Sequence, residues 1–471
     1  MLLFVLMNLF MSFFPENGTS VFGLHLNFPT ISKFYSLNED TLITIDEKQQ
    51  ELEKILAKLK LDSIKIDLQL KKQIQDSIDD AWKKLQYPEN DKTILYAFFQ
   101  QLDNARNEKV RIMHFGDSQI EADRITSYVR NELQKEFGGG GAGLFAIEQV
   151  TRKMSVKQTH SNNWSRHAGF GRKKDTSIKH KKYGVLLAYS KYSPLVDSTQ
   201  IPNYESWVKI KRPTASFSKA KRYNELNIYY GNSKHKSYLE VFIDSTNIEN
   251  DSLKSGIGVN TKKIKFPSTP KELTLKFSGV ESPDFYALSI ESTKGVIMDN
   301  IPLRGASGTE FSKQDKSCMK DMFNYLNPSL LILEFGGNTI PYIKSKERAF
   351  KYGKWFGSQI RLLKTLCPNA TVLVIGPADM SKKEETNFIT YPLLSEVRNA
   401  LKEHTFKEGG VFWDMYEAMG GQNTMPKWAE EEPPLASKDY IHFTSKGARK
   451  IAELFYSSLK EDYNAYKAQD K

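Results

Sequence analysis

Three side chains that lie far apart along this sequence are of the types that acyl transfer requires. A serine hydroxyl attacks a carbonyl only when a neighbouring base, usually a histidine oriented by a carboxylate, removes its proton. Ser118 follows a short apolar segment and precedes a segment with a helical pattern. Of the eight histidines, His442 is the one with a carboxylate, Asp439, three residues earlier in a loop that leads into a helix. The sequence therefore predicts Ser118 as nucleophile, His442 as base and Asp439 as orienting acid.

Donors for a developing oxyanion are also available. Backbone N–H groups at helix starts and side-chain amides stabilise such a charge, and losing one donor typically lowers the rate ~10²–10³-fold. Ser118 offers its own N–H, Gly308 offers a second backbone N–H, and Asn338 offers a side-chain amide. We predict that these three residues form the oxyanion hole.

These residues need elements that bring them to one edge of a sheet. Short apolar segments typical of buried strands lie at 110–115, 296–298, 330–335, 371–375 and 411–413. Segments with helical patterns lie at 122–137, 345–366 and 445–463. Strands that alternate with helices predict a parallel sheet covered on both faces. Ligand sites in such sheets lie at the carboxyl ends of the strands, where the motifs fall.

The segment 150–284 has a different pattern. It is rich in Lys, Ser, Thr and Tyr, and its strand-like runs have no long helices between them. Many short strands separated by turn residues predict an antiparallel β-sandwich. The simplest organisation is one discontinuous α/β domain at 92–149 and 285–465, which this β-rich domain interrupts after the glycine-rich stretch 138–143.

The N-terminal part predicts export. Residues 1–14 form an apolar run that is too short to span a bilayer comfortably and is typical of a signal peptide. We expect a signal or anchor segment at 1–20, with location in the periplasm or cell envelope and membrane proximity if the segment is retained. The segment 45–90 has the spacing of amphipathic helices, which either form a coiled-coil spacer or pack on the next domain.

Composition narrows the classes of function. The chain has 471 residues, 39% hydrophobic and 26% charged, which excludes a collagen-like, wholly disordered or polytopic membrane protein. A net charge of +11 suits an acidic partner, such as an anionic polysaccharide, a nucleic acid or a lipid surface, or else a solvated basic face. Cys318 and Cys367 form no metal-binding or redox motif, and the sequence has no nucleotide-binding loop. We expect no cofactor and no bound metal.

Taken together, the motifs resemble the SGNH hydrolases, also called the GDSL esterase and lipase superfamily. They are GDS at 116–118, ASGT at 306–309, GGN at 336–338 and DYIHF at 439–443. The resemblance implies a flavodoxin-like parallel sheet with helices on both faces, and it implies the triad and oxyanion roles given above. Thr339 stands where many members carry an Asp that is not catalytic.

A narrower resemblance concerns the nucleophile block. The sequence HFGDSQIEAD at 114–123, followed by the glycine-rich stretch and a β insert, resembles bacterial peptidoglycan O-acetylesterases. Those enzymes carry a carbohydrate-binding-like β domain at this place, and they usually have His where this chain has Gln119. The resemblance implies a serine esterase that removes O-acetyl groups from a cell-wall polysaccharide, above all peptidoglycan. Its partner would be that acetylated glycan, and we expect no nucleic acid.

Two other functions stay open on the sequence. The same residues could transfer the acetyl group to a glycan hydroxyl, because the motifs do not show whether water or an acceptor completes the reaction. A non-catalytic glycan-binding protein, with the β insert as its working part, ranks last because no member of the triad is missing.

Overall fold

The structure is a computed structural model that describes two units of the chain. The described residues are 6, 18–26, 54, 56–61, 64–66, 69–70, 83–171, 178–194 and 203–469. The units are Met1–Ile78 and Asp79–Lys471. In the first unit, β1 (Thr19–Val21) pairs antiparallel with β2 (Leu24–Leu26). The predicted signal or anchor segment 1–20 lies almost wholly outside the described residues.

The segment 45–90 is described only in part. Its described residues between 54 and 70 are helical. Its end differs from the expected helix, because β3 (Leu85–Gln86) pairs with another strand and η2 (Pro88–Asn90) is a 3-10 turn. Within the described part of the chain, no helix combines the length and the apolar character that a membrane crossing requires.

One sheet of the second unit carries the parallel strands. They are β4 (Lys109–Gly116), β16 (Gly295–Pro302), β17 (Pro328–Glu334), β18 (Thr371–Ile375) and β21 (Val411–Trp413). The spatial order is β16-β4-β17-β18-β21-β3, with β3 antiparallel at the edge. Numbered along the chain, the parallel strands run 2-1-3-4-5, which is the flavodoxin-like order. The predicted parallel sheet is confirmed.

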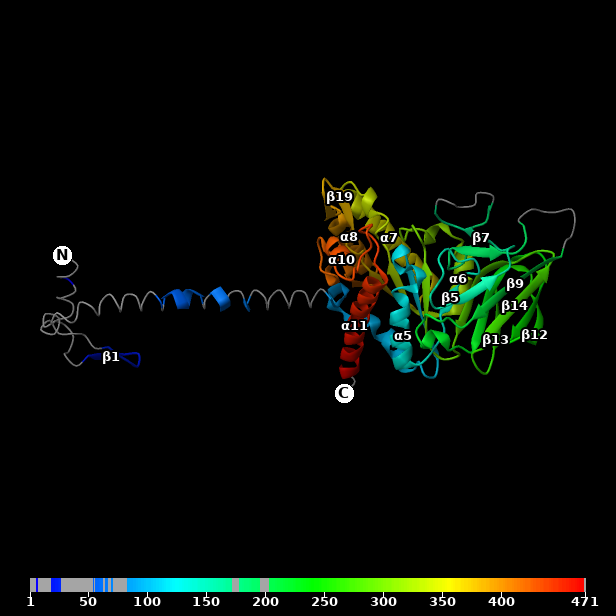
Figure 1. The fold of residues 1–471 in the computed structure, drawn as a ribbon, viewed down its shortest axis with the longest axis horizontal. Helices are drawn as coiled ribbons and strands as arrows, with labels where there is room; N and C mark the ends of the chain where they lie inside the picture. The colour runs from blue at the N-terminus through cyan, green and yellow to red at the C-terminus, as the bar shows by residue number, and fades with distance from the viewer. Residues whose placement is uncertain are drawn as a thin grey trace. The chain divides into compact units, whose positions relative to one another are not determined.

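Helices cover both faces of this sheet (Figure 1), because successive strand residues point to opposite sides. The helices are α4 (Tyr96–Asp103), α5 (Thr126–Phe137), α6 (Lys316–Leu326), α7 (Lys346–Leu366), α8 (Leu394–Lys407) and α11 (Ser445–Gln469). Val110 and Ile112 of β4 belong to a core shared with α4, α5 and α11. Met113 and Phe115 of the same strand belong to the opposite core, shared with α6, α7 and α8.

Shorter elements lie in the connections. They are η3 (Lys92–Leu95), η4 (Ser118–Asp123), η5 (Lys219–Lys221), η6 (Phe311–Lys313), η7 (Ile340–Tyr342), α9 (Met415–Ala418), α10 (Thr424–Glu430), and the hairpin of β19 (Ser381–Glu384) and β20 (Asn387–Thr390). Of these, η4 and η7 follow strands of the parallel sheet and carry residues of the site described below.

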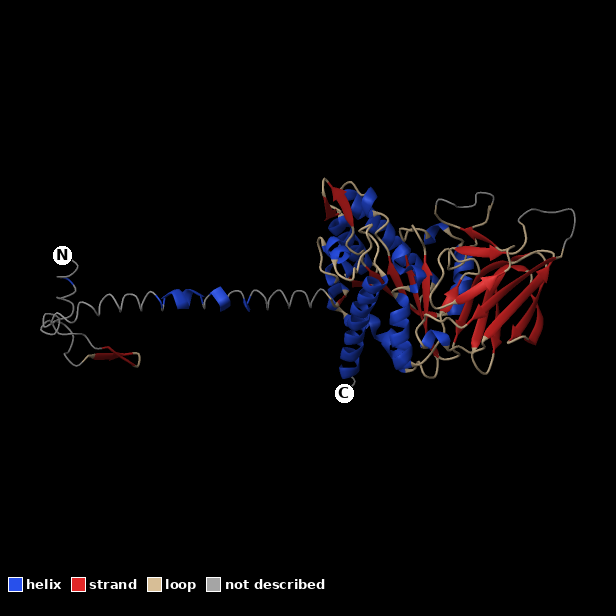
Figure 2. Ribbon diagram, in the orientation of Figure 1, coloured by secondary structure: helices blue, strands red, loops and turns tan. Residues whose placement is uncertain are grey.

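Two antiparallel sheets form the inserted part (Figure 2). One has the order β13-β10-β15-β8-β7, with β5 also paired to β15, and the other has the order β12-β11-β14-β9-β6. The strands are β5 (Gly143–Phe145), β6 (Lys157–His160), β7 (Ser165–Ala168), β8 (Ala188–Lys191), β9 (Tyr204–Lys211), β10 (Glu225–Ser233), β11 (Ser237–Ile243), β12 (Thr246–Leu253), β13 (Gly256–Lys265), β14 (Glu272–Gly279) and β15 (Asp284–Glu291). Leu226 and Ile228 of the first sheet share a buried core with Leu273 and Leu275 of the second. The predicted antiparallel insert is therefore present.

The insert begins and ends outside the expected limits of 150 and 284. β5 pairs with β15, and β15 pairs with β10 in the same antiparallel sheet. Both strands are buried and apolar in pattern, like those of the parallel sheet, so their composition did not show which sheet they join. Hydrogen-bond pairing extends the antiparallel part to Gly143–Phe145 at one end and Asp284–Glu291 at the other.

In the glycine-rich stretch 138–143 the backbone passes very close to the backbones of β15 and β16. Gly139 has φ +104°, and a Cβ there would come 2.4 Å from the carbonyl oxygen of Val296. Gly141 has φ +85°, and a Cβ there would come 2.2 Å from the carbonyl oxygen of Ile290. Only glycine combines this backbone conformation with so close an approach. The stretch therefore packs the exit of α5 directly against β15 and β16.

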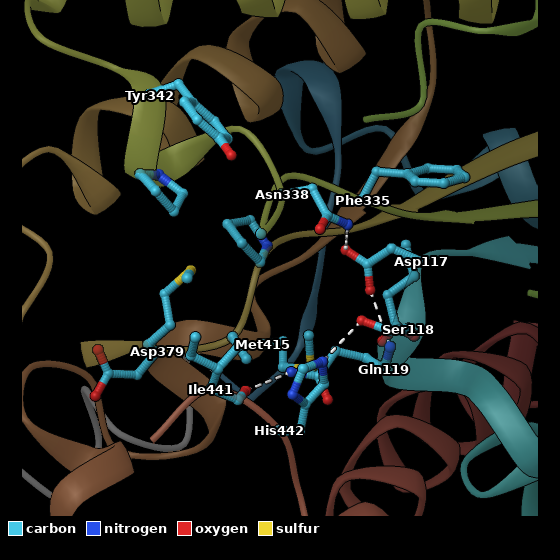
Figure 3. Close-up of a pocket in the computed structure, with 16 residues that line it drawn as sticks. Asp117, Ser118, Gln119, Phe335, Asn338, Tyr342, Asp379, Met415, Ile441 and His442 are labelled. Carbon is cyan, nitrogen blue, oxygen red and sulfur yellow. Dashed lines mark hydrogen bonds between the residues drawn. The ribbon is translucent and has the colours of Figure 1, made fainter. Parts of the chain in front are cut away.

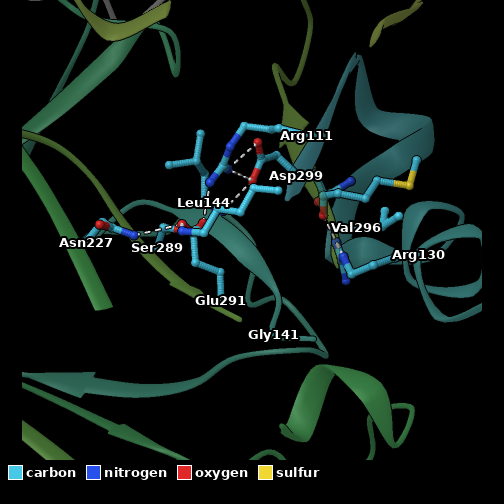
Figure 4. A network of polar contacts seen from close by, with 12 residues as sticks. Arg111, Arg130, Gly141, Leu144, Asn227, Ser289, Glu291, Val296 and Asp299 are labelled. Carbon is cyan, nitrogen blue, oxygen red and sulfur yellow. Dashed lines mark hydrogen bonds and ion pairs between the residues drawn. The ribbon is translucent and has the colours of Figure 1, made fainter. Parts of the chain in front are cut away.

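A buried ionic network joins the two sheets (Figure 4). Arg111 of β4 donates to both carboxylate oxygens of Asp299 on β16, each at 2.9 Å, and also pairs with Glu291 of β15. Lys109 bridges Glu291 at 2.7 Å and Glu225 of β10 at 2.5 Å. Burial would raise the pKa of Glu291, but Arg111 and Lys109 outweigh it and lower that pKa to about 2. The network therefore holds the insert against the parallel sheet with charged groups on both sides.

We expect Arg111→Met to lower the free energy of unfolding by about 3–5 kcal/mol, because it leaves the buried Asp299 without its cation and leaves Glu291 with Lys109 alone. Urea denaturation of the full chain measures this change. Arg361→Met is the matched control, since Arg361 is 70% exposed and pairs with Glu408 at the surface; we expect it to change the free energy by less than about 1 kcal/mol. Equal effects of the two substitutions would contradict a stabilising role for the network.

Candidate active site

The serine, the histidine and the aspartate predicted to act together lie in one hydrogen-bonded row. Figure 3 shows the Ser118 and His442 side chains facing each other at the cavity. The Oγ atom of Ser118 is 2.8 Å from Nε2 of His442, a residue 324 positions later in the chain. The Nδ1 atom of His442 is 2.7 Å from Oδ2 of Asp439. The imidazole therefore has one nitrogen on the serine and the other on the carboxylate, the arrangement that a serine nucleophile needs.

The loop before α11 presents the histidine. Oδ1 of Asp439 accepts hydrogen bonds from the backbone N–H groups of Ile441 and His442, both at 3.0 Å, while Oδ2 contacts the imidazole. One carboxylate thus shapes the loop and orients the ring. Burial would raise the pKa of Asp439, but these hydrogen bonds outweigh it and lower that pKa. Asp439 is therefore ionised near neutral pH and can stabilise a protonated His442.

A 3-10 helix presents the serine. β4 ends at Gly116, and Asp117 caps η4 by accepting the N–H of Gln119 on Oδ1 at 2.9 Å. Ser118 is the first residue of η4, so the helix itself does not use its N–H. Ser118 therefore lies at the carboxyl end of the central strand β4, with its own N–H available to a ligand.

Two non-glycine residues with left-handed backbones follow Ser118 in η4. Ala122 has φ 56° and Asp123 has φ 66°, conformations that cost on the order of 1–3 kcal/mol each. Arg130 of α5 stabilises this turn by donating to both carboxylate oxygens of the fully buried Asp123, at 2.7 and 2.9 Å. The turn places the guanidinium of Arg124 within hydrogen-bonding distance of the carbonyl of Ser118.

Arg124 and Gln119 join the serine turn to the histidine loop. The guanidinium of Arg124 donates to the carbonyl of Ser118 at 2.9 Å and to the carbonyl of Phe443 at 2.8 Å. The side-chain amide of Gln119 donates to the carbonyl of Ile441 at 2.6 Å and accepts the N–H of Phe443 at 3.5 Å. The residues on both sides of His442 are thus held by side chains from the nucleophile segment. We name Arg124 and Gln119 together the loop clamp.

Two of the three predicted oxyanion donors, Ser118 and Asn338, line one cavity. The amide nitrogen of Asn338 points to Asp117 in Figure 3, reaching Oδ2 of Asp117 at 3.3 Å and the carbonyl of Ala306 at 3.1 Å. These two acceptors fix its orientation. Gly308 is buried behind Phe335, with φ +79°, and is not among the described residues that line the cavity at Ser118. The oxyanion roles of Ser118, Gly308 and Asn338 remain predictions.

A cavity of about 200 Å³ opens at the serine and the histidine. It is lined by Asp117, Ser118, Gln119, Glu334, Phe335, Gly337, Asn338, Pro341, Tyr342, Pro377, Ala378, Asp379, Met380, Met415, Ile441 and His442. Tyr342 is 67% exposed, so its ring stands at the edge of the cavity. The side chain of His442 is 34% exposed, so water can reach the imidazole.

A buried carboxyl group lies beneath this cavity. Burial raises the pKa of Asp117 to about 7, with Glu334 and Glu121 adding to the shift and the hydrogen bond from Gln119 opposing it. His114, the histidine that precedes the motif, is also buried and contacts Thr126 and Glu334. His114 and Phe115 lie on opposite faces of β4, and His114 is not among the described residues that line the cavity. We therefore assign His114 a packing role.

The sequence did not indicate the loop clamp. Gln119 was recognised only as a departure from the histidine found in similar enzymes, and Arg124 gave no signal, because its acceptors are carbonyls more than 300 positions away or in its own turn. Among the described residues, no group of histidine, cysteine and acidic side chains is arranged to hold a metal ion. Cys318 and Cys367 are both free and buried.

The parallel sheet has the flavodoxin-like order, and the row of Ser118, His442 and Asp439 lies at the carboxyl end of β4. No protein-family model matches the sequence, and neither does any curated protein. A solved structure of a peptidoglycan O-acetylesterase matches 81% of this chain and 99% of its own, with a TM-score of 0.61 at 20% identity. That likeness confirms the SGNH resemblance at the level of the fold.

Other solved esterases give weaker matches. An acetyl xylan esterase is 17% identical over 35% of this chain and 81% of its own, with a TM-score of 0.27. A family two carbohydrate esterase from Clostridium thermocellum is 10% identical over 64% of this chain and 99% of its own, with a TM-score of 0.26. Scores this low add nothing to the argument.

Gln119→Leu removes both hydrogen bonds of the Gln119 amide while keeping most of its volume. We expect the rate at which a fluorophosphonate probe modifies Ser118 to fall about 10-fold or more, because a small misplacement of the base lowers the reactivity of the serine. Mass spectrometry of the intact protein over time measures this rate. Gln100→Leu, on the exposed side of α4, is the control. An unchanged rate in the Gln119 variant would refute the clamp's positioning role.

The raised pKa of Asp117 predicts a pH dependence of stability. Between the ordinary pKa near 3.8 and about 7, the folded protein keeps a proton that the unfolded chain releases, so stability falls as pH rises. The amide that replaces this carboxyl group in Asp117→Asn does not titrate. We therefore expect the unfolding free energy of the wild type to fall, relative to that of Asp117→Asn, by up to about 1.4 kcal/mol for each unit that the pH rises in this window. Urea denaturation at pH 5, 6, 7 and 8 tests it, and a difference that is constant with pH would contradict it.

Proposed function

We propose that this protein is a serine esterase that removes O-acetyl groups from a cell-wall glycan, peptidoglycan in particular. The observation that carries the proposal is the row of Ser118, His442 and Asp439 at the mouth of a cavity. The fold likeness to a peptidoglycan O-acetylesterase supports it. A non-catalytic glycan-binding function would not explain why these three side chains are hydrogen-bonded in this order.

The proposed reaction begins with attack of Ser118 Oγ on the acetyl carbonyl. His442 Nε2 takes the hydroxyl proton, and Asp439 stabilises the resulting imidazolium through Nδ1. Collapse of the tetrahedral intermediate breaks the bond to the glycan oxygen, which receives the proton from His442. Water then attacks the acetyl-serine, His442 again takes a proton, and acetate leaves with Ser118 restored.

The shape of the cavity supports a small acyl group. At about 200 Å³, the cavity is smaller than the ~300–1,000 Å³ typical of sites for drug-sized ligands. Phe335, Asn338 and Pro341 are among its lining residues, and the exposed Tyr342 forms its outer part. An acetyl group fits at the serine, and the remainder of a glycan would extend past the exposed Tyr342.

The same proposal covers substrate and location. The net charge of +11 favours an anionic wall polymer, and the apolar N-terminal run favours export to the periplasm or cell envelope. Hydrolysis is preferred over transfer to a second glycan because the partly exposed His442 is accessible to water. Acetyl transfer with the same residues is the outcome that the following assay distinguishes.

Ser118→Ala tests the proposal. Incubation of the wild type with O-acetylated peptidoglycan should release acetate and remove the acetyl mass increment from muropeptides, as followed by mass spectrometry. The variant should be slower by at least ~10⁴-fold, because no other group can form the acetyl-enzyme. Turnover that survives in Ser118→Ala would refute the assigned nucleophile.

Asn338→Ala serves as the graded variant in the same assay, with an expected ~10²–10³-fold loss if the amide is an oxyanion donor. An added unacetylated glycan that gains acetyl while free acetate falls would indicate transfer instead of hydrolysis.

A further inference from the structure

A second cavity lies where the insert meets the parallel sheet. Its volume is about 390 Å³, within the ~300–1,000 Å³ range of small-ligand sites. Its walls come from β5, β7 and β8, from the connection after β5, and from the carboxyl end of β16. Glu121 of η4 and Arg304 close one side. The reaction proposed above does not use this cavity.

Arg166 of β7 is the first sign that the cavity holds a ligand. Its partly exposed side chain lines the wall, yet it forms no hydrogen bond or ion pair with any described residue. Burial lowers its pKa, and Glu148 opposes that effect from a distance. Glu148 instead approaches His160, with Oε1 3.4 Å from Nε2. A partly exposed guanidinium with five N–H donors and no acceptor among the described residues is free to bind an acceptor on a ligand.

Lys153 is the second sign. It is only 7% exposed and lines the same cavity. Its Nζ donates to the carbonyls of Leu144 at 2.6 Å and Asn300 at 2.5 Å, which leaves one of its three donors without a described acceptor. Burial lowers the pKa of Lys153 to about 8, so it is still mostly cationic at neutral pH. The cavity therefore has two cations without carboxylate partners.

Two carboxylates, Glu121 and Glu148, also line the cavity, and of these Glu121 is paired with an arginine while Glu148 approaches His160. Arg304 binds Glu121 with two parallel hydrogen bonds of 2.5 Å and also reaches the hydroxyl of Thr151 at 2.9 Å. The remaining wall is mostly apolar, with the rings of Phe145 and Phe170 among its residues. A complementary ligand has a negative group at one end and a ring with apolar faces.

The second cavity is close to the nucleophile. Ser118 lines the first cavity and Glu121 lines the second, and both residues belong to η4. Three residues of chain span at most ~11 Å, so the two cavities flank one short segment. A polymer whose ester reaches Ser118 can therefore place another of its units in the second cavity.

We propose that this second cavity binds a carboxylate-bearing sugar unit of the glycan, with Arg166 gripping the carboxylate through paired hydrogen bonds and Lys153 adding a single donor. The identity of the polymer rests on the proposed function. The binding of a carboxylate-bearing sugar does not depend on it. Arginine matches a carboxylate in two parallel hydrogen bonds, which selects an acid over a neutral sugar. Both a lactyl ether acid, as in muramic acid, and a uronic acid present this chemistry.

Calorimetric titration of the full-length protein with four free sugars tests the proposal. N-acetylmuramic acid is compared with N-acetylglucosamine, and glucuronic acid is compared with glucose. We expect at least one acid to bind at least ~10-fold more tightly than its neutral counterpart, and the better acid identifies the source of the carboxylate. Acids that bind no better than the neutral sugars, or not at all, would overturn the proposal.

Arg166→Met should reduce the affinity for the preferred acid to that of its neutral counterpart, at least ~10-fold. Arg361→Met, which removes the same charge from the surface of α7, should leave it unchanged. A preserved acid preference in Arg166→Met would refute the assignment. If this variant fails to fold in a thermal melt, Arg166→Lys and the four-sugar comparison on the wild type decide.

The two proposals fail separately. Acetate release by the wild type without any acid preference would refute this site and leave the esterase intact. Acid binding together with turnover that survives in Ser118→Ala would refute the nucleophile and leave the sugar site intact.

Discussion

The contact between Ser118 and His442 closes a loop of 324 residues, and its own energy is too small to do so. Closing a flexible loop of that length costs about 5 kcal/mol beyond a constant, whereas one hydrogen bond contributes roughly 0.5–1.5 kcal/mol. The hydrophobic cores on both faces of the parallel sheet must therefore bring the two residues together. The hydrogen bonds of Arg124 and Gln119 then fix the last few ångströms, because they act directly on the backbone beside the histidine.

Sheet pairing and a few buried polar contacts also explain how the chain accommodates a large insert between β4 and β16. These strands are neighbours in the parallel sheet although the whole antiparallel part lies between them in sequence. Arg111 sits on β4 and binds both Asp299 of β16 and Glu291 of β15. One buried cation thus links the strand that carries the nucleophile, its neighbour in the sheet and the last strand of the insert. Because an unpaired buried charge is strongly unfavourable, this link also fixes the orientation of the insert.

Features set by residues close together in the sequence could be predicted, whereas contacts between residues far apart in the sequence mostly could not. Strands, helices and the Asp439–His442 pair follow from local patterns, and the family resemblance added the link to Ser118. The side-chain contacts of Arg124 and Gln119 have acceptors that are backbone carbonyls, and a carbonyl carries no residue identity that a sequence could show. Likewise, the apolar pattern of a buried strand is the same in a parallel and an antiparallel sheet, so the limits of the insert were misplaced by a few residues. Gly308 matched a motif, but its place behind Phe335 depends on packing.

The position of the insert gives it a means of acting on the substrate. Its first strand, β5, and the connection after it run beside the carboxyl end of β16, which is also the edge where Ser118 lies. Arg166 and Lys153 line the cavity at that edge, and Arg111 joins β4 to β15 and β16. A wall built from two rigidly joined sheets is ordered before the ligand arrives, so binding a polymer unit there does not require further ordering of the protein. With the sugar site proposed above, the insert forms part of the proposed substrate cleft and is not a separate binding module.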